Sequence, residues 1–207
     1  ASPKTQSALL EAMEEGSVTV DGETRRLARP FCVIATQNPI EHEGTYPLPH
    51  AELDRFMIRM ELGYPDGEAE VGLLRLSRDP ASELSPVVGL EEFVRMQRMA
   101  EEVHASEAVL RYVVSVTAAT REHGEVALGA SPRASRMLLA AAKARAAVSG
   151  RSYCTPDDVK ALAPAVLAHR IILSTASRGS GNGFGSDGVA GEIVREILSS
   201  VPVTEAV

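Results

Sequence analysis

Residues 31–36 constrain the fold more than any other part of this 207-residue sequence. They read Phe-Cys-Val-Ile-Ala-Thr, an almost continuous apolar run that is typical of a strand covered on both faces of a parallel sheet. Such a strand needs neighbouring strands and covering helices. Nearby, only a hairpin and residues 56–62 are strand-like. We therefore expect the sheet to be half present, with further strands upstream of Ala1.

Local signals around this run predict the other elements of the first part. A helix over residues 4–15 is followed by Gly16 as a C-terminal stop. Asp21-Gly22 separates two short alternating runs, which predicts a tight β-hairpin because both turn residues tolerate positive φ. A loop rich in Pro and Gly then leads to a short helix over residues 51–55.

The periodicity becomes helical after the turn cluster at residues 63–67, where we place a domain boundary. Ser131-Pro132 and Thr155-Pro156 each supply an N-cap followed by proline, which predicts two helix starts. The expected organisation is an α/β part followed by an all-α part. Its segments are 1–63 (α/β), 64–176 (helical, with helices over 68–78, 90–103 and 106–123), 177–188 (flexible Gly/Ser linker) and 189–207 (a helix over 189–199 and a tail).

Charge and composition narrow the function classes. The formal net charge of −7 argues against a general nucleic-acid binder. No apolar run is long enough for a transmembrane helix, and no signal-peptide pattern is visible at the polar start. Cys32 and Cys154 are isolated, which is typical of a reduced protein. We expect a cytoplasmic protein.

Three polar positions are candidates for chemistry, and each has a plain structural alternative. Asn38 follows the predicted buried strand, where ligands bind in open α/β sheets, but Asn-Pro is also a common turn signal. Arg55 could offer a guanidinium to a phosphate or be a solvated surface charge. Arg133 lies in a first helical turn, where the helix dipole disfavours cations, so it could bind an anion or reach back to an acidic residue.

These positions together resemble the MoxR family of AAA+ ATPases. The resemblance rests on the order of motifs along nearly the whole chain: Pro-Lys-Thr-Gln-Ser-Ala-Leu-Leu-Glu-Ala-Met at 3–13, Ala-Thr-Gln-Asn-Pro at 35–39, Gly-Thr-Tyr-Pro-Leu-Pro at 44–49, Leu-Asp-Arg-Phe at 53–56 and Ser-Pro-Arg-Ala at 131–134. It implies the C-terminal part of an AAA+ three-layer α/β/α core followed by a helical lid domain.

The resemblance also implies roles for single residues. Asn38 would be sensor 1, which orients the hydrolytic water, and Arg55 would be the arginine finger acting on a neighbouring subunit. Arg133 would be sensor 2 on the lid. The hairpin at residues 18–27 resembles an insertion that often faces the ring pore. The family implies a homo-oligomer, expected to be a hexameric ring, that remodels or matures protein partners such as von Willebrand factor A domain proteins.

One departure from the family pattern concerns ATP and Mg²⁺. The sequence contains no Gly-x-x-x-x-Gly-Lys-Ser/Thr loop and no Walker B carboxylates, the groups that hold the nucleotide and the metal in the family. The Gly-rich stretch at residues 179–188 does not replace them. We therefore expect these motifs upstream of Ala1, and we expect this chain alone to be inactive.

Two other functions stay open. The helical part could be a non-catalytic interaction module, and the ATPase subunit of magnesium chelatase shares much of the same pattern. The five histidines are scattered without metal-ligand spacing, so we expect no zinc site. No Gly-x-Ser-x-Gly motif indicates a hydrolase nucleophile.

Overall fold

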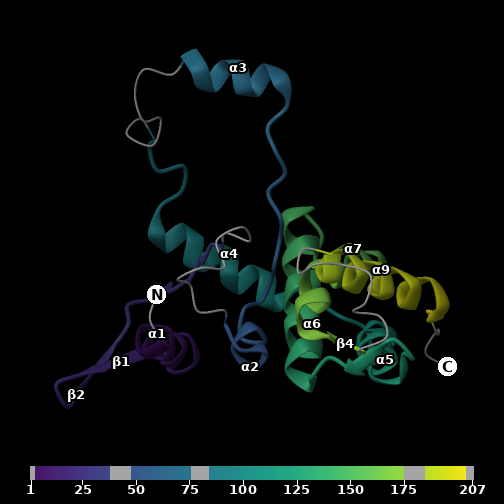
Figure 1. Cartoon of the computed structure of the whole chain (residues 1–207). Coiled ribbons are helices and arrows are strands. Elements are labelled where there is room, and N and C mark those ends of the chain that lie inside the picture. Colours follow the sequence, from purple (N-terminus) through teal and green to yellow (C-terminus); the bar gives the residue numbers. More distant parts are fainter. Residues whose placement is uncertain (1–2, 38–47, 76–83, 175–184, 204–207) are drawn as a thin grey trace.

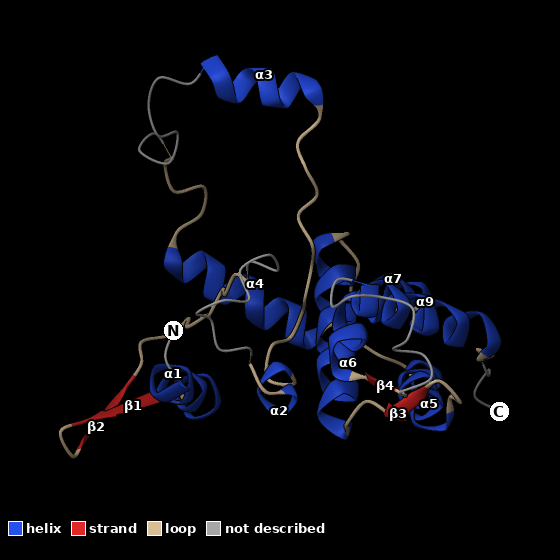
Figure 2. Ribbon diagram, in the orientation of Figure 1, coloured by secondary structure: helices blue, strands red, loops and turns tan. Residues whose placement is uncertain are grey.

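The computed structural model describes residues 3–37, 48–75, 84–174 and 185–203, and these are mostly helical (Figure 2). Two antiparallel two-stranded sheets, β1-β2 and β3-β4, are the sheets of the described part. The elements are α1 (Pro3–Glu15), β1 (Ser17–Val20), β2 (Glu23–Arg26), α2 (His50–Leu53), α3 (Gly67–Arg75), α4 (Leu90–Glu102), α5 (Glu107–Glu122), β3 (Val126–Leu128), α6 (Pro132–Val148), α7 (Pro156–Leu167), the 3-10 helix η2 (Ala168–Arg170), β4 (Ile172–Leu173) and α9 (Gly185–Ser200).

The N-terminal helix and hairpin form as the sequence predicts. Helix α1 ends at Gly16, which has a φ of 62°, and the Gly16 amide donates to the Ala12 carbonyl. The register pairs Val20 with Glu23, so Asp21 and Gly22 form the two-residue turn with φ values of 52° and 82°. Two positive φ values in a two-residue turn match the twist of the flanking strands, which fixes this hairpin locally.

The two strands predicted at residues 31–36 and 56–62 are not formed in the described part of the chain. Both segments are extended and largely exposed; the side chain of Ile34 is 90% exposed and that of Leu62 is 92% exposed. Cys32 is exposed as well, not buried as we expected. The physical reason is that an apolar run becomes a strand only when backbone groups on a neighbour complete its ladder. The described residues supply no such neighbour to either run.

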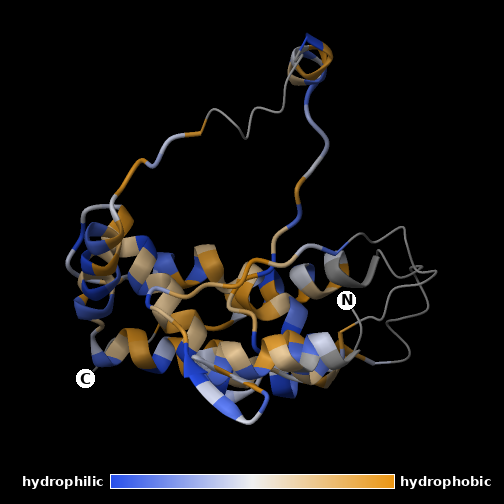
Figure 3. Ribbon diagram, turned by 90° about the vertical axis from the view of Figure 1, so that its left-hand side faces the viewer, coloured by the Kyte–Doolittle hydropathy of each residue, from blue (hydrophilic) through white to orange (hydrophobic). Residues whose placement is uncertain are grey.

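The bundle of α5, α6, α7 and α9, called the lid below, is built around one aliphatic core (Figure 1). All residues of this core cluster lie between Val103 and Ile197. The buried face of α7 carries Val159, Ala163 and Val166, which are fully buried, and Leu162 packs beside them. Hydrophobic and hydrophilic residues alternate along these helices in the ribbon coloured by hydropathy (Figure 3). Helix α3 lies apart from this bundle and has no buried residue among those described (Figure 1).

Three of the lid helices begin after an N-cap Ser or Thr, and Ser131 and Thr155 were predicted in this position. The Ser106 hydroxyl accepts from the Val109 amide at the start of α5. At the start of α7, Thr155 and Asp158 form a reciprocal capping box. Ser131 has the extended backbone of an N-cap before α6, but its side chain does not cap that helix. Its hydroxyl donates to the Asp54 carboxylate at 3.1 Å instead, so it joins the lid to the segment after α2.

Two features of the lid differ from expectation. Strands β3 and β4 were not predicted, since runs of three and two residues are too short to show an alternating pattern. Helix α9 begins at Gly185, so residues 185–188 belong to it, whereas we assigned them to the linker. Most of the predicted linker lies outside the described residues. Within the described ranges, no helix combines the length and the apolar character needed to cross a membrane.

Candidate functional site

Two of the three predicted site residues meet at one carboxylate. Glu14 lies near the end of α1, Arg55 follows α2, and Arg133 is in the first turn of α6. The distance from Arg55 Nε to Glu14 Oε1 is 3.0 Å, and that from Arg133 Nη2 to the same oxygen is 2.7 Å. The fold therefore brings the arginines of the Leu-Asp-Arg-Phe and Ser-Pro-Arg-Ala motifs together. The contact of Arg133 with Glu14 is also the ion pair with an acidic residue that we gave as the structural alternative for Arg133.

The electrostatics of this cluster favour the charged forms. The Arg55 guanidinium, more than that of Arg133, holds the pKa of Glu14 below its usual value. The same contact raises the pKa of Arg55. The Arg133 side chain stays 44% exposed and that of Arg55 29% exposed, so neither side chain is fully buried. Partly exposed cations that already share one anion can exchange it for another at modest cost.

Asp54 is the second acid of the site, and it connects three parts of the chain. Its carboxylate accepts from the Ser131 hydroxyl and lies 3.9 Å from Arg133 Nη1. The Arg170 Nε donates to Asp54 Oδ1 at 3.0 Å. Asp54, the residue immediately before Arg55, therefore contacts both the start of α6 and the end of η2.

Arg170 is the residue of this cluster that the sequence did not predict. Its side chain has no exposed surface. Besides Asp54 Oδ1, its guanidinium donates to the carbonyl oxygens of Asp54 and Met57 at 3.1 and 3.2 Å, to those of Phe56 and Val166, and to the thioether of Met137. The available signal was an arginine between apolar Leu167-Ala168 and Ile171-Ile172, where a solvated charge is out of place.

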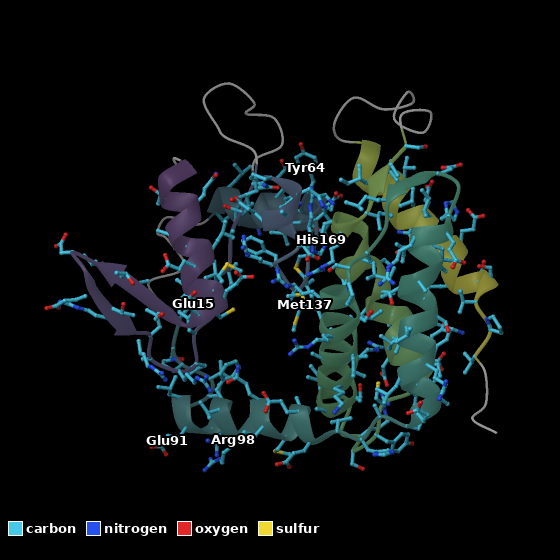
Figure 4. All side chains as sticks on the ribbon, turned by 90° about the horizontal axis from the view of Figure 1, so that it is seen from below. Glu15, Tyr64, Glu91, Arg98, Met137 and His169 are labelled. Atoms are coloured by element: carbon cyan, nitrogen blue, oxygen red, sulfur yellow. The ribbon has the colours of Figure 1, made fainter. Side chains whose placement is uncertain are left out.

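His169 supports the same segment from the same side. Its Nε2 lies 3.1 Å from the Phe56 carbonyl oxygen, and Figure 4 shows His169 and Met137 on the side of the lid turned toward α2. Burial, and then the charge of Arg170, lowers the pKa of His169 to about 4. The imidazole is therefore neutral near pH 7. Its Nε2 lies 2.8 Å from Arg170 Nη1 as well, so it donates to the Phe56 carbonyl in one tautomer and accepts from Arg170 in the other.

The remaining predicted position, Asn38, lies outside the described residues. Nothing in the described part of the chain tests the fit of a complete nucleotide site. The full sequence has no phosphate-cradling loop, and the described residues form no group of acids, histidines or cysteines that could hold a metal. The residues present fit one part of a phosphate site only, the cationic part supplied by Arg55 and Arg133.

Comparison with known families matches both parts of the chain. Residues 1–58 match the family described as ATPase family associated with various cellular activities (AAA). Residues 118–196 match the AAA lid domain. The first range contains Glu14, Asp54 and Arg55, and the second contains Arg133 and Arg170. The cluster of ion pairs therefore joins residues from two matched domains.

Individual proteins give the same result. YeaC of Bacillus subtilis is 49% identical over 205 residues, covering 98% of this chain and 62% of that protein. Chaperone MoxR1 of Mycobacterium tuberculosis is 42% identical over 180 residues, covering 83% of this chain and 48% of that protein. The crystal structure of a candidate ATPase from Cytophaga hutchinsonii superimposes with a TM-score of 0.85 at 36% identity, covering 99% of this chain and 63% of that one.

The chain thus spans between 48% and 63% of the length of these three proteins. The helix-rich arrangement and the lid agree with the AAA+ fold of the solved relative. The motifs, the two domain matches and the MoxR relatives lead to one conclusion: this chain belongs to the MoxR family of AAA+ ATPases.

Proposed function

We propose that this chain is the interface-forming part of an ATPase ring that hydrolyses ATP between neighbouring subunits and uses the energy to remodel partner proteins. In this proposal the ring is a hexamer in the cytoplasm, and its partners include von Willebrand factor A domain proteins. Arg55 acts on the nucleotide of a neighbouring subunit, and Arg133 reports the nucleotide state to the lid. The MoxR relatives, one of them named a chaperone, support the proposal.

The observation that carries this proposal is the convergence of Arg55 and Arg133 on Glu14 Oε1. A phosphate oxygen that reached the same position would meet both guanidinium groups. Phosphoryl transfer spreads negative charge over the equatorial oxygens, and a positioned arginine neutralises it without any covalent step. In this family such an arginine serves a nucleotide that another subunit holds.

We assign the remaining chemistry to other residues. Bound Mg²⁺ supplies charge neutralisation between the β- and γ-phosphates of ATP. The described residues do not form a site for it, so we assign it no step on this chain. Asn38 is proposed to orient the attacking water in its own subunit, because a neutral amide can hydrogen-bond the water without adding charge.

Complementation between two inactive variants tests this proposal on the full-length protein. Arg55→Ala removes the group offered to the neighbour, and Asn38→Ala damages the subunit's own site. Arg55→Ala alone is expected to lose about a thousandfold or more in kcat, by analogy with other arginine fingers, and Asn38→Ala alone should also lose turnover because its attacking water is not oriented. Mixed in equal amounts, they should recover about a quarter of wild-type turnover, because one interface in four joins an intact site to an intact arginine.

Arg111→Ala is the matched control, since Arg111 is an exposed arginine of the lid paired only with Glu107 on the same helix. It should leave turnover unchanged. No recovery in the mixture of Arg55→Ala and Asn38→Ala would mean that Arg55 does not act across the interface, provided that native mass spectrometry shows mixed rings. Full activity of Arg55→Ala would remove the arginine from the mechanism altogether.

A further inference from the structure

The segment that carries Arg55 is held on both sides by one buried cation. Arg170 Nη2 donates to the carbonyl oxygens of Asp54 and Phe56, the residues immediately before and after Arg55. Its Nε binds the Asp54 carboxylate at 3.0 Å, and its Nη1 reaches the Met57 carbonyl. These contacts fix the backbone at residue 55 without touching the Arg55 side chain.

Arg170 is itself firmly placed by the lid. It ends η2, directly after α7, and the next residues, Ile171 and then Leu173 of β4, are buried in the lid core. Its Nη1 also donates to the Val166 carbonyl, and the Met137 thioether of α6 contacts its Nη2. A guanidinium without exposed surface and with this many acceptors has one available orientation.

Helix α2 is a weak support by comparison. It has four residues, none of them buried, and its Pro49 N-cap makes no side-chain hydrogen bond. A single turn of helix is marginal in isolation because nucleation is unfavourable. The position of Arg55 therefore depends on what lies against residues 54–57, and in the described structure that is mainly Arg170, with His169 on the Phe56 carbonyl.

We propose that Arg170 and Asp54 are positioning residues for Arg55, through which the lid of one subunit sets the arginine that it offers to the next. This inference rests on the proposed function. Ser131 and Arg133 at the start of α6 also contact the Asp54 carboxylate. A shift of α6 or η2 relative to α2 therefore displaces the backbone of Arg55. A misplacement of about 1 Å in such a group costs on the order of a hundredfold in rate.

The same complementation design separates positioning from a general defect. If Arg170→Met acts through Arg55, it belongs to the same complementation group as Arg55→Ala, because both variants impair the arginine that a subunit offers to its neighbour. Mixed with Asn38→Ala it should recover turnover, and mixed with Arg55→Ala it should not. Alone, Arg170→Met should lower kcat by about ten- to a hundredfold. Its KM for ATP should stay within about twofold of wild type, because ground-state binding in its own site is unchanged.

Arg151→Met is the matched control. It also removes an arginine from a lid Arg–Asp pair, the one with Asp158, but that pair contacts no residue of the segment 54–57. It should lower thermal stability and leave kcat near wild type. If Arg170→Met subunits do not assemble into rings, the same mixtures are made with Asp54→Asn. This variant keeps the volume of the Asp54 side chain and removes its negative charge.

Each outcome decides between the two proposals. Recovery of Arg170→Met by Arg55→Ala, or wild-type kcat in both Arg170→Met and Asp54→Asn, would overturn the positioning role and leave the trans role of Arg55 intact. Failure of the pair Arg55→Ala and Asn38→Ala to recover would remove the proposed function, and the positioning role with it. In the first case the mixture of Arg55→Ala and Asn38→Ala still recovers turnover, and in the second case it does not. The two failures can therefore be told apart.

Discussion

Asp54 and Arg170 are 116 residues apart in the chain and form an ion pair of 3.0 Å in which the arginine has no exposed surface. One partner lies in the AAA match and the other in the lid match. The lid therefore does not meet the preceding part through apolar packing alone. It holds that part with a buried charge, whose loss leaves an uncompensated partner.

Removing the acid of this pair is expected to destabilise the chain. Asp54→Ala leaves the Arg170 guanidinium buried without its anion, which lowers the free energy of unfolding by about 3 kcal/mol. Urea unfolding followed by circular dichroism measures the change. Glu23→Ala is the control, because its pair with Arg25 is exposed and contributes little. Equal shifts for both variants would contradict the importance of the buried pair.

Stability should fall in mild acid because of His169. Its folded pKa of about 4 lies below the unfolded value of 6.5, so the unfolded chain takes up a proton that the folded chain refuses. Stability is complete above pH 6.5 and decreases as pH falls toward 4. Between pH 7 and pH 5, wild type should lose about 2 kcal/mol more than His169→Gln, whose amide can still donate to Phe56. If the free energy of unfolding has the same pH dependence in the two proteins, His169 is not the cause of the loss.

The start of α7 depends on Asp158. Its buried carboxylate accepts from Arg151 Nη1 and Nη2 at 2.7 and 2.6 Å and from the amide and hydroxyl of Thr155, and the Arg151 contact holds its pKa well below the usual range. Asp158→Asn should cost about 2 kcal/mol of unfolding free energy. Asp157→Asn, one residue earlier and exposed, should cost only roughly 0.3 kcal/mol, from the helix dipole. Thermal melts that rank the two the other way would contradict the capping role.

A fourth stability prediction concerns Gly129, between β3 and α6. A Cβ at this position falls 2.6 Å from Arg121 Cα, a backbone atom that cannot move aside alone. Gly129→Ala should therefore destabilise by about 1–3 kcal/mol through overpacking. Gly124→Ala is the matched control, since nothing lies within 4 Å of its added Cβ. A neutral Gly129→Ala would show that α5 and the β3–α6 connection shift apart freely.

The sequence predicted those parts of the fold that short-range chemistry decides. Asp21-Gly22 fixes its hairpin within four residues, and Ser106 and Thr155 begin their helices through bonds to amides three residues on. The strands at residues 31–36 and 56–62 were predicted from apolar pattern alone, and pattern does not supply a ladder partner. Strands β3 and β4 pair residues more than forty positions apart, which no local signal encodes.

The site was predictable in part for the same reason. Arg55 and Arg133 belong to motifs that can be read in order along the chain. Glu14 joins them only through the tertiary fold, 119 residues before Arg133. Arg170 showed one local sign, a charge inside an apolar stretch, but its partner is fixed by packing of η2 against the segment after α2. The roles of Asn38, Arg55 and Arg133 stay predictions.

The confinement of the core cluster to residues between Val103 and Ile197 has a consequence for how the chain opens. Amide hydrogens of α5, α6 and α7 should exchange with solvent deuterium together and slowly, as one foldon. Residues 54–59 have no comparable core. Their contacts with the lid include the Arg59 amide, which donates to the Ala165 carbonyl of α7, and the Met57 carbonyl, which accepts from Arg170. The amide hydrogens of residues 54–59 should therefore be protected from exchange only while these residues contact the lid. Their exchange rates would measure how often the two parts separate.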